Sequence, residues 1–392
     1  MKRSAALLLA GGLVDETGFR IGQVALPLIA LTATGSTASV GLVAGLAGVP
    51  VLLAPWWARR IRQRLTTSRQ LALLHLLEAL VMSGLALGVW LDSVSVVLLG
   101  AVGFGRGVMA ALVMPARSSI LADLGDRFRE RGAARLLAWD DAQTRVALVA
   151  GPPIGVVLWS AGAVPASCGV VLACMIAAAL SWFAGVRTEP STAHAPSIRA
   201  ALAGSREIVA GWWIRGTGCL CWFAFSLGLP VLSADDGGLL AAVGFTAYGC
   251  GGVVAALVAT RLVDRVRPLV WAAFGWTVCG AAFAAMAVWP TVPVVVSSAL
   301  AAGLTTPLGN ACISALVVRA TVGPDRRAAL AGQRTLVTAA STLGTLAGAP
   351  MFAAIGTRET MIGAGALVAF TPPLVMTAVR RSATRREPTA VS

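Results

Sequence analysis

The chain has 392 residues, of which 57% are apolar and only 12% are charged. Soluble domains carry about 25% charged residues, so this composition, with a mean hydropathy of +0.81, excludes an ordinary soluble protein and indicates a multi-pass membrane protein. The net charge of +14 does not indicate a nucleic-acid partner, because the basic residues lie in short segments between apolar runs.

Twelve apolar segments are long enough to cross about 30 Å of hydrocarbon at about 1.5 Å per residue. All are predicted to be helical, because lipid does not tolerate an open sheet edge. The predicted fold class is therefore an all-α membrane protein with twelve transmembrane helices. The expected spans are 4–32, 39–58, 71–91, 94–117, 135–160, 165–186, 208–232, 237–260, 268–289, 292–318, 328–355 and 360–379.

The basic residues predict the orientation of the chain. Nearly all of the 31 Lys and Arg residues fall in the termini and in alternate connections, with Arg117 counted at the edge of one of them. The other connections contain only Arg358, and they carry acidic residues such as Asp92 and Glu359. By the positive-inside rule, both termini are expected in the cytoplasm, for a protein of the cell (inner or plasma) membrane.

The longest polar connection, Arg187–Arg206, contains EPSTAHAPS and has the composition of a flexible linker. It predicts an N-terminal six-helix bundle (1-187), a cytoplasmic linker (188-206), and a C-terminal six-helix bundle with a short cytoplasmic tail (207-392). A proline, a charged connection and a Gly/Pro motif recur in this order in both halves, around Pro115 and Pro307. This weak repeat indicates two pseudo-symmetric bundles, an arrangement that places substrate near the midplane between them.

The stretch Gly12–Pro27, GLVDETGFRIGQVALP, places Asp15, Glu16 and Arg20 near the middle of the first span. Ionisable groups at that depth cost roughly 2.5–3.5 kcal/mol each, so they are expected to be paired or functional. Glu16 and Arg20 are four residues apart and predict a local pair. Asp15 lies on a different face and is the favoured proton-carrying group.

Further charges lie inside other spans. Arg106 in GFGRGVMA needs a carboxylate partner, and the candidates are Asp15, Glu16, Asp140 and Asp141. Asp141 and Arg145 are four residues apart and predict a pair at the start of the fifth span. His75 and Glu78 share a face of the third span, where a proton role is open because histidine titrates near neutral pH.

These features resemble the major facilitator superfamily, most closely its drug-efflux and siderophore-exporter branch. The first span of that branch reads roughly G-D-x-x-x-x-x-A-L-P followed by TGS, which Asp15, Ala25–Pro27 and Thr34–Ser36 match. The resemblance implies the two-bundle fold, export as the direction of transport, and a link between the span-four arginine, here Arg106, and proton transfer.

Three segments resemble conformational motifs of the same superfamily. The antiporter motif of its exporters is similar to GPPIG in the fifth span, although a simple proline kink is the plainer interpretation. Arg60 matches the arginine of the loop motif G-x-L-A-D-R-x-G-R-R, but Arg59 stands where that motif has Asp, and RLVDR is a closer copy. Positive-inside topology also accounts for most of these arginines. The residues assigned to gating are Gly151, Pro152, Pro153, Gly155, Arg60, Asp264 and Arg265.

Uncharged polar residues inside spans are the candidate substrate-cavity groups. They are Gln23 in the first span and Thr306 and Asn310 in the tenth, where Asn310 is the only Asn of the chain. Such residues also form plain hydrogen bonds between helices, so both roles remain open for each of them.

No enzyme signature is present: the sequence has no Walker loop, no GxSxG and no HExxH. The seven cysteines lie in apolar segments without a CxxC pair, which is typical of packed side chains rather than metal ligands. The sequence therefore predicts neither enzymatic activity nor a cofactor or metal.

The predicted function is proton-coupled export of a small amphipathic compound by alternating access. Asp15, Glu16 and Arg106 are expected to couple protons, with Arg20, Asp140, Asp141 and Arg145 as buried charge partners. The expected partners are a small-molecule substrate, protons and the lipid bilayer, and the expected state is a monomer. Two alternatives remain open, namely an importer of the same fold and a transport-inactive membrane sensor or assembly partner.

Overall fold

In a computed structural model of the chain, residues 2–127, 132–188, 206–262, 265–320 and 323–384 are described. Nearly all of them are helical. The helices are α1 (Lys2–Thr34), α2 (Thr37–Trp57), α3 (Arg59–Arg64), α4 (Ser68–Trp90), α5 (Val96–Asp126), α6 (Gly132–Ser160), α7 (Ala163–Ala184), α9 (Arg206–Leu220), η1 (Ala224–Gly228), α10 (Leu229–Leu232), α11 (Leu239–Leu262), α12 (Pro268–Val288), α13 (Val292–Ala320), α14 (Gly323–Ile355) and α15 (Thr357–Thr384).

Twelve spans can be traced through the described residues, as expected from the sequence. Length and hydropathy alone select ten of them, counting α9, η1 and α10 as one span. The other two are α1 and α6, with 33 and 29 residues. Both carry charged side chains in mid-helix, which lower their hydropathy, yet both pack against other spans.

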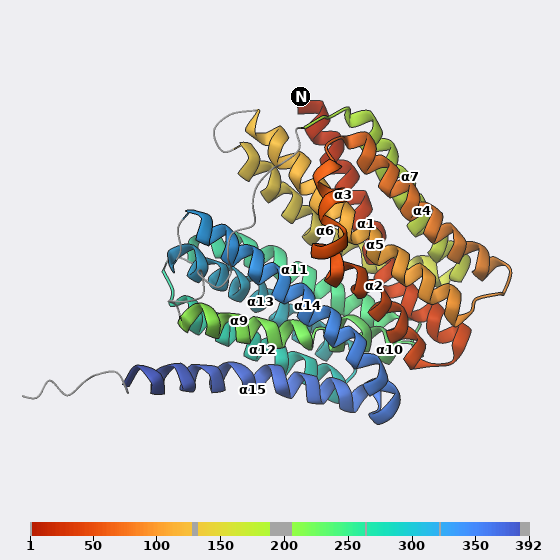
Figure 1. The fold of residues 1–392 in the computed structure, drawn as a ribbon. Helices are drawn as coiled ribbons and strands as arrows, with labels where there is room; N and C mark the ends of the chain where they lie inside the picture. Colours follow the sequence, from red (N-terminus) through yellow and green to blue (C-terminus); the bar gives the residue numbers. More distant parts are fainter. Residues whose placement is uncertain (1, 128–131, 189–205, 263–264, 321–322, 385–392) are drawn as a thin grey trace, which may run out of the picture.

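The spans pack in two groups (Figure 1). Helices α1, α2, α4, α5, α6 and α7 pack against one another, and α9 to α15 form the second group. The main contacts between the groups join α2 to α14 and α6 to α11. The predicted linker 188-206 lies almost entirely outside the described residues, and the domain boundaries 1-187 and 207-392 stay a prediction.

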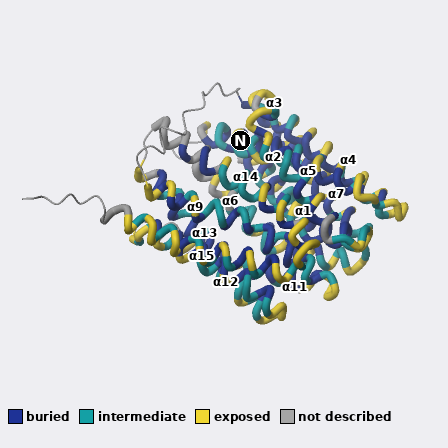
Figure 2. Tube along the Cα trace, turned by 60° about the horizontal axis from the view of Figure 1, so that its bottom comes forward, coloured by how far each residue is buried: buried dark blue, intermediate teal, exposed yellow. Residues whose placement is uncertain are grey.

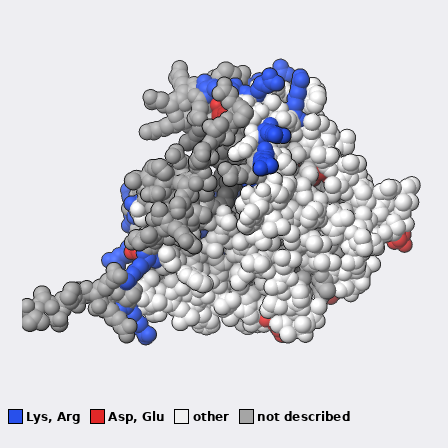
Figure 3. Space-filling view, viewed as in Figure 1, with Lys and Arg blue, Asp and Glu red and all other residues white. Residues whose placement is uncertain are grey.

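The outer surface of the helices is apolar, as a bilayer requires. In Figure 2, buried stretches run along the inner sides of the helices and exposed stretches along the outer sides, including that of α15. On α15 the exposed side chains include Leu367, Phe370 and Leu374. Figure 3 shows Lys and Arg side chains gathered toward one end of the molecule, with most of the remaining face uncharged.

The two ends of the bundle can be named from their charges. The basic end is where α1 begins and α2 ends, and it carries Arg3, Arg60 and Arg127, all exposed. The acidic end is opposite and carries the exposed residues Asp92 and Asp235.

Three local features differ from the expected elements. Helix α5 continues to Asp126, nine residues past the predicted end of its span. The seventh span is broken, because α9 ends at Leu220 and a π-helix, η1, follows before α10. The basic connection after α2 contains a short helix, α3, rather than a loop throughout. Single π-helical turns occur often at functional sites.

Close packing of α5 on α2 depends on glycine. A methyl group built on Gly107 would overlap the backbone carbonyl of Ala47, so only glycine allows this approach.

We expect Gly107→Val to lower the free energy of unfolding by about 1–3 kcal/mol, because the helices must separate to admit the side chain. The matched control is Gly84→Val in α4, where a Cβ meets no atom within 4 Å. Apparent Tm values of the two variants in detergent would measure the difference. Equal values would show that the close approach of α5 to α2 does not depend on glycine at position 107.

Candidate functional site

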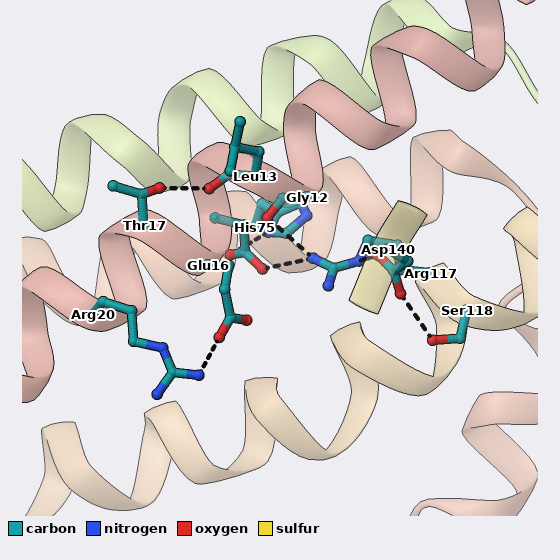
Figure 4. A network of polar contacts seen from close by, with 10 residues as sticks. Gly12, Leu13, Glu16, Thr17, Arg20, His75, Arg117, Ser118 and Asp140 are labelled. Atoms are coloured by element: carbon teal, nitrogen blue, oxygen red, sulfur yellow. Dashed lines mark hydrogen bonds and ion pairs between the residues drawn. The ribbon is translucent and has the colours of Figure 1, made fainter. Parts of the chain in front are cut away.

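Arg117 lies at the centre of a buried charge network between α1, α5 and α6 (Figure 4). Its Nη1 is 3.3 Å from Oδ2 of Asp15, and its Nε is 3.0 Å from Oδ1 of Asp140. Only 2% of the Arg117 surface is exposed. One guanidinium therefore compensates two carboxylates carried by different helices.

The placement of Arg117 corrects the sequence interpretation, which assigned this residue to a cytoplasmic connection. Because α5 continues to Asp126, Arg117 is inside the helix and faces the bundle. The partly buried carboxylates of Asp15 and Asp140 explain why an arginine is stable there, since an unpaired charge would be costly at that position.

His75 and Glu78 of α4 complete the site beside Asp15. Nδ1 of His75 is 3.3 Å from Oδ1 of Asp15, and the imidazole is fully buried. Atoms of Asp15, His75 and Glu78 that could bind a ligand all lie within 4.8 Å of one another. We call these three residues the acid–histidine cluster.

Arg106 of α5 borders this cluster. Its Nε is 3.8 Å from Oε1 of Glu78, so its ion-pair partner is a carboxylate that was not among the four candidates from the sequence. The guanidinium also lies over the ring of Phe19, 5.1 Å from the centroid. Arg106 is buried. Its ion pair is longer than those of Arg117, and the cation–π contact with Phe19 adds to the stabilisation of its charge.

Glu16 and Arg20 form a separate pair on the next face of α1. Nη2 of Arg20 donates to Oε1 of Glu16 at 2.6 Å, and its Nη1 donates to Oε1 of Gln23 at 3.0 Å. Gln23 thus takes part in this chain of polar contacts. Phe19 contacts both arginines, since the guanidinium of Arg20 also lies over its ring, 5.2 Å from the centroid.

Two glycines of α1 make room for the arginines of α5. A Cβ on Gly12 would lie 3.1 Å from Nη1 of Arg117, and one on Gly22 would lie 2.8 Å from Nη1 of Arg106. These glycines and the three charges belong to the same stretch of α1. Small residues on a charged helix are the sequence signal that could have linked α1 to the arginines of α5.

The other charges predicted in the fifth span have separate surroundings. Asp140 accepts a hydrogen bond from Oγ of Ser118 at 3.4 Å. Arg145 donates from Nη1 to the carbonyl oxygen of Gly252 at 3.3 Å, across the boundary between the two groups of helices. The side chain of Asp141 lies outside the described residues.

The residues predicted to act in gating divide between two places. Gly151 and Gly155 face α1, where a Cβ on Gly155 would lie 3.1 Å from the carbonyl oxygen of Ile21. Pro152 and Pro153 lie in mid-helix, and α6 continues through them. In the two basic connections, Arg60 and Arg265 are exposed, whereas Asp264 lies outside the described residues.

Among the described residues, cavities lie between the groups of helices at two places. One has a volume of about 330 Å³ and lies between α6, α9, α11 and α13. We call it the arginine cavity, and Arg145, Leu148, Arg215, Tyr248, Asn310 and Ser314 are among its lining residues. The other, of about 310 Å³, lies between α2, α5 and α14 and includes Arg62 and Thr335. Asn310 thus lines a cavity, whereas Thr306 is packed in the bundle with 1% of its surface exposed.

The acid–histidine cluster has the donor types of a metal site, but its surroundings do not favour a cation. Arg106 and Arg117 both pair with members of the cluster, and two guanidinium charges repel a metal ion at this distance. The cluster is better suited to binding and releasing protons, since it combines an imidazole with two carboxylates.

No family model matches the chain, and no curated protein matches it in sequence. Solved structures match it closely in shape. A point mutant of the nucleoside transporter NupG aligns with a TM-score of 0.75 at 12% identity, over 95% of this chain and 99% of that one.

Two further transporter structures align over nearly their whole length. A bacterial homologue of the lysosomal transporter Spinster, inward-facing and unoccupied, has a TM-score of 0.75 at 11% identity, over 99% of this chain and 98% of that one. A bacterial homologue of the iron transporter ferroportin, also inward-facing, has a TM-score of 0.73 at 14% identity, over 96% and 98%. The expected major facilitator fold is thereby confirmed.

Proposed function

We propose that the chain is a secondary transporter that exports a small amphipathic molecule in exchange for protons. The observation that carries this proposal is the largely buried acid–histidine cluster, which is carried by α1 and α4 and is bordered by Arg106 and Arg117 of α5. Charges at membrane depth are rare and are typical of proton relays and substrate pathways. The shared fold with solved transporters supports alternating access as the mechanism.

Within the cluster, Glu78 is the carboxylate best placed to gain and lose a proton. Both oxygens of Asp15 have a partner, Oδ1 with His75 and Oδ2 with Arg117. Among the described residues, the ion pair of Glu78 is with Arg106, at the longer distance of 3.8 Å. Asp15 remains part of the proton site, because groups this close titrate as one coupled unit.

Protonation of Glu78 would change the contacts between α1, α4 and α5. A neutral Glu78 no longer attracts Arg106, whose guanidinium then keeps its contact with Phe19 of α1. The other charged groups near the cluster are Glu16 and Arg20 on α1 and Asp140 on α6. Loss of this ion pair is a local change, but it can shift the equilibrium between two arrangements of the helices.

Contacts between the two groups of helices support an inward-facing state. Oγ1 of Thr342 donates to the carbonyl oxygen of Gly48 at 3.4 Å, near the middle of α14 and α2. Nearer the acidic end the same two helices pack closely, because a Cβ on Gly45 would overlap the side chain of Leu346. Further along the same pair, toward the basic end, residues such as Pro55 and Thr338 line a cavity instead. With the basic end in the cytoplasm, the path between the groups opens inward.

Transport in inverted vesicles tests the proposal. We expect an imposed pH gradient, acidic inside the vesicle, to drive uptake of at least one compound from a panel of amphipathic drugs and metabolites. Uptake should vanish when the gradient is dissipated by an ionophore. Uptake only in right-side-out vesicles would assign import, and no gradient-dependent uptake of any compound would overturn proton-coupled transport.

A further inference from the structure

The arginine cavity is lined by cationic side chains from both groups of helices. Arg145 comes from α6 of the first group and Arg215 from α9 of the second. Asn310 and Ser314 of α13 add two uncharged polar groups. Among the described lining residues there is no Asp or Glu, so the charge facing the cavity is positive.

Two polar atoms of the described cavity residues are buried without a hydrogen-bond partner. Within the described residues, Nε of Arg215 and Oδ1 of Asn310 are of this kind. Buried polar groups are nearly always paired, and each exception needs an explanation. Oγ of Ser314 accepts from Nε2 of Gln333 at 3.3 Å, so its own O–H can donate toward the cavity.

The wall beside these groups includes one aromatic side chain among the described lining residues. Tyr248, the only tyrosine of the chain, lines the cavity, and its ring lies 5.3 Å from those of Trp222 and Phe225. A cavity of about 330 Å³ is at the small end of the range for ligand sites, roughly 300–1,000 Å³. Its combination of cationic groups and an aromatic side chain suits a small amphipathic anion.

We infer that the transported molecule is an organic anion whose carboxylate or similar anionic group binds Arg215 and Arg145 in the arginine cavity. The inference rests on the proposed transport function and names the class of its substrate. The planar guanidinium presents paired N–H donors that match the two oxygens of a carboxylate. The carboxamide of Asn310 can turn its NH₂ group to the same anion.

The position of the cavity links binding to the movement of the bundles. Arg145 and Arg215 belong to different groups of helices, and Nη1 of Arg145 already contacts the α11 carbonyl of Gly252. An anion held by both arginines joins the two groups. Substrate would thus bind more tightly to conformations in which α6 and α9 are close than to those in which they are apart. Alternating access requires such a difference in affinity between conformations.

Equilibrium binding to the purified full-length protein tests the inference without relying on transport. The probes are salicylate, an aromatic carboxylate, and its neutral analogue salicylamide, with the protein in nanodiscs of phosphatidylcholine. We expect salicylate to bind about tenfold or more tightly than salicylamide, as loss of a charge-assisted hydrogen bond predicts. Calorimetry and ligand-induced shifts in Tm are the measurements.

Variants then assign the binding to the cavity. Arg215→Gln should weaken salicylate binding about tenfold or more, Arg215→Lys should weaken it less because the charge is kept, and salicylamide binding should not change. The matched control is Arg3→Gln, an exposed arginine at the start of α1. If Arg215→Gln does not fold, salicylate binding to Arg215→Lys and to Asn310→Ala tests the site instead.

The outcomes separate this inference from the proposed function. Equal binding of the two probes, or binding that Arg215→Gln leaves unchanged, would overturn the anion site. Phosphatidylglycerol that displaces salicylate from wild type would also overturn it, because the occupant would then be a lipid headgroup. If any of these results is found and the protein still takes up neutral or cationic compounds in response to a pH gradient, the anion site is wrong but the proposed transport function stands.

Discussion

Replacing Arg117 with methionine is expected to lower the free energy of unfolding by about 3–5 kcal/mol, the range measured when one partner of a buried ion pair is removed. Asp15 and Asp140 would lose the cation that lies 3.3 and 3.0 Å from them. Methionine fills much of the volume of arginine, so the loss is electrostatic rather than a cavity. Unfolding in detergent, followed by tryptophan fluorescence, is the measurement.

Two further variants isolate the charge effect. Arg64→Met changes an exposed arginine of α3 in the same way and should change stability by less than about 1 kcal/mol, as surface substitutions do. Adding Asp15→Asn and Asp140→Asn to Arg117→Met should restore part of the lost stability, because the uncompensated charges are removed. If Arg117→Met and Arg64→Met unfold alike, Arg117 does not hold these carboxylates.

The fold could be predicted from the sequence because lipid imposes one strong rule, that backbone polar groups are paired within helices. Hydropathy alone was not sufficient, since α1 and α6 are not among the ten spans that it selects. They were recognised as apolar segments long enough to span, in spite of their charges, and the arginine distribution supported the count because it requires an even number of spans between two basic termini. Asp15 of α1 and Asp140 of α6, which lower the hydropathy of their helices, both belong to the charge network around Arg117.

The charge network was only partly predictable, because a sequence shows which groups need partners but not which partners they find. The Glu16–Arg20 pair is four residues apart on one helix, so helical geometry determines it. The contact between Asp15 and Arg117 joins residues 102 positions apart and depends on how α1 and α5 pack. Glu78 was noted for its histidine neighbour, and only tertiary packing brings it to Arg106.

The break in the seventh span could not be predicted either. The stretch 208–232 is apolar except for Arg215, Thr217 and Ser226, and it contains no proline before Pro230, so its composition favours one helix. In the structure, Trp222 lies between α9 and η1, and its ring contacts those of Phe225, Tyr248 and Phe283. Packing of this aromatic cluster outweighs the small cost of one irregular turn.

Replacing Glu78 with glutamine is expected to abolish pH-gradient-driven accumulation while leaving substrate exchange in place. Glutamine has the shape of a protonated glutamate but cannot release a proton, so the carrier would cycle without coupling. Accumulation in inverted vesicles should fall to the level without a gradient, whereas counterflow of substrate between equal pH values should continue.

The control is Glu207→Gln, an exposed glutamate at the start of α9, which should transport like wild type. Asp15→Asn is expected to lose accumulation and also to lower Tm, because Arg117 would keep only one of its two carboxylates. Comparison of the two site variants thus separates a coupling role from a structural one. Accumulation by Glu78→Gln at the wild-type level would show that the proton travels elsewhere, since no group at this position could then release it.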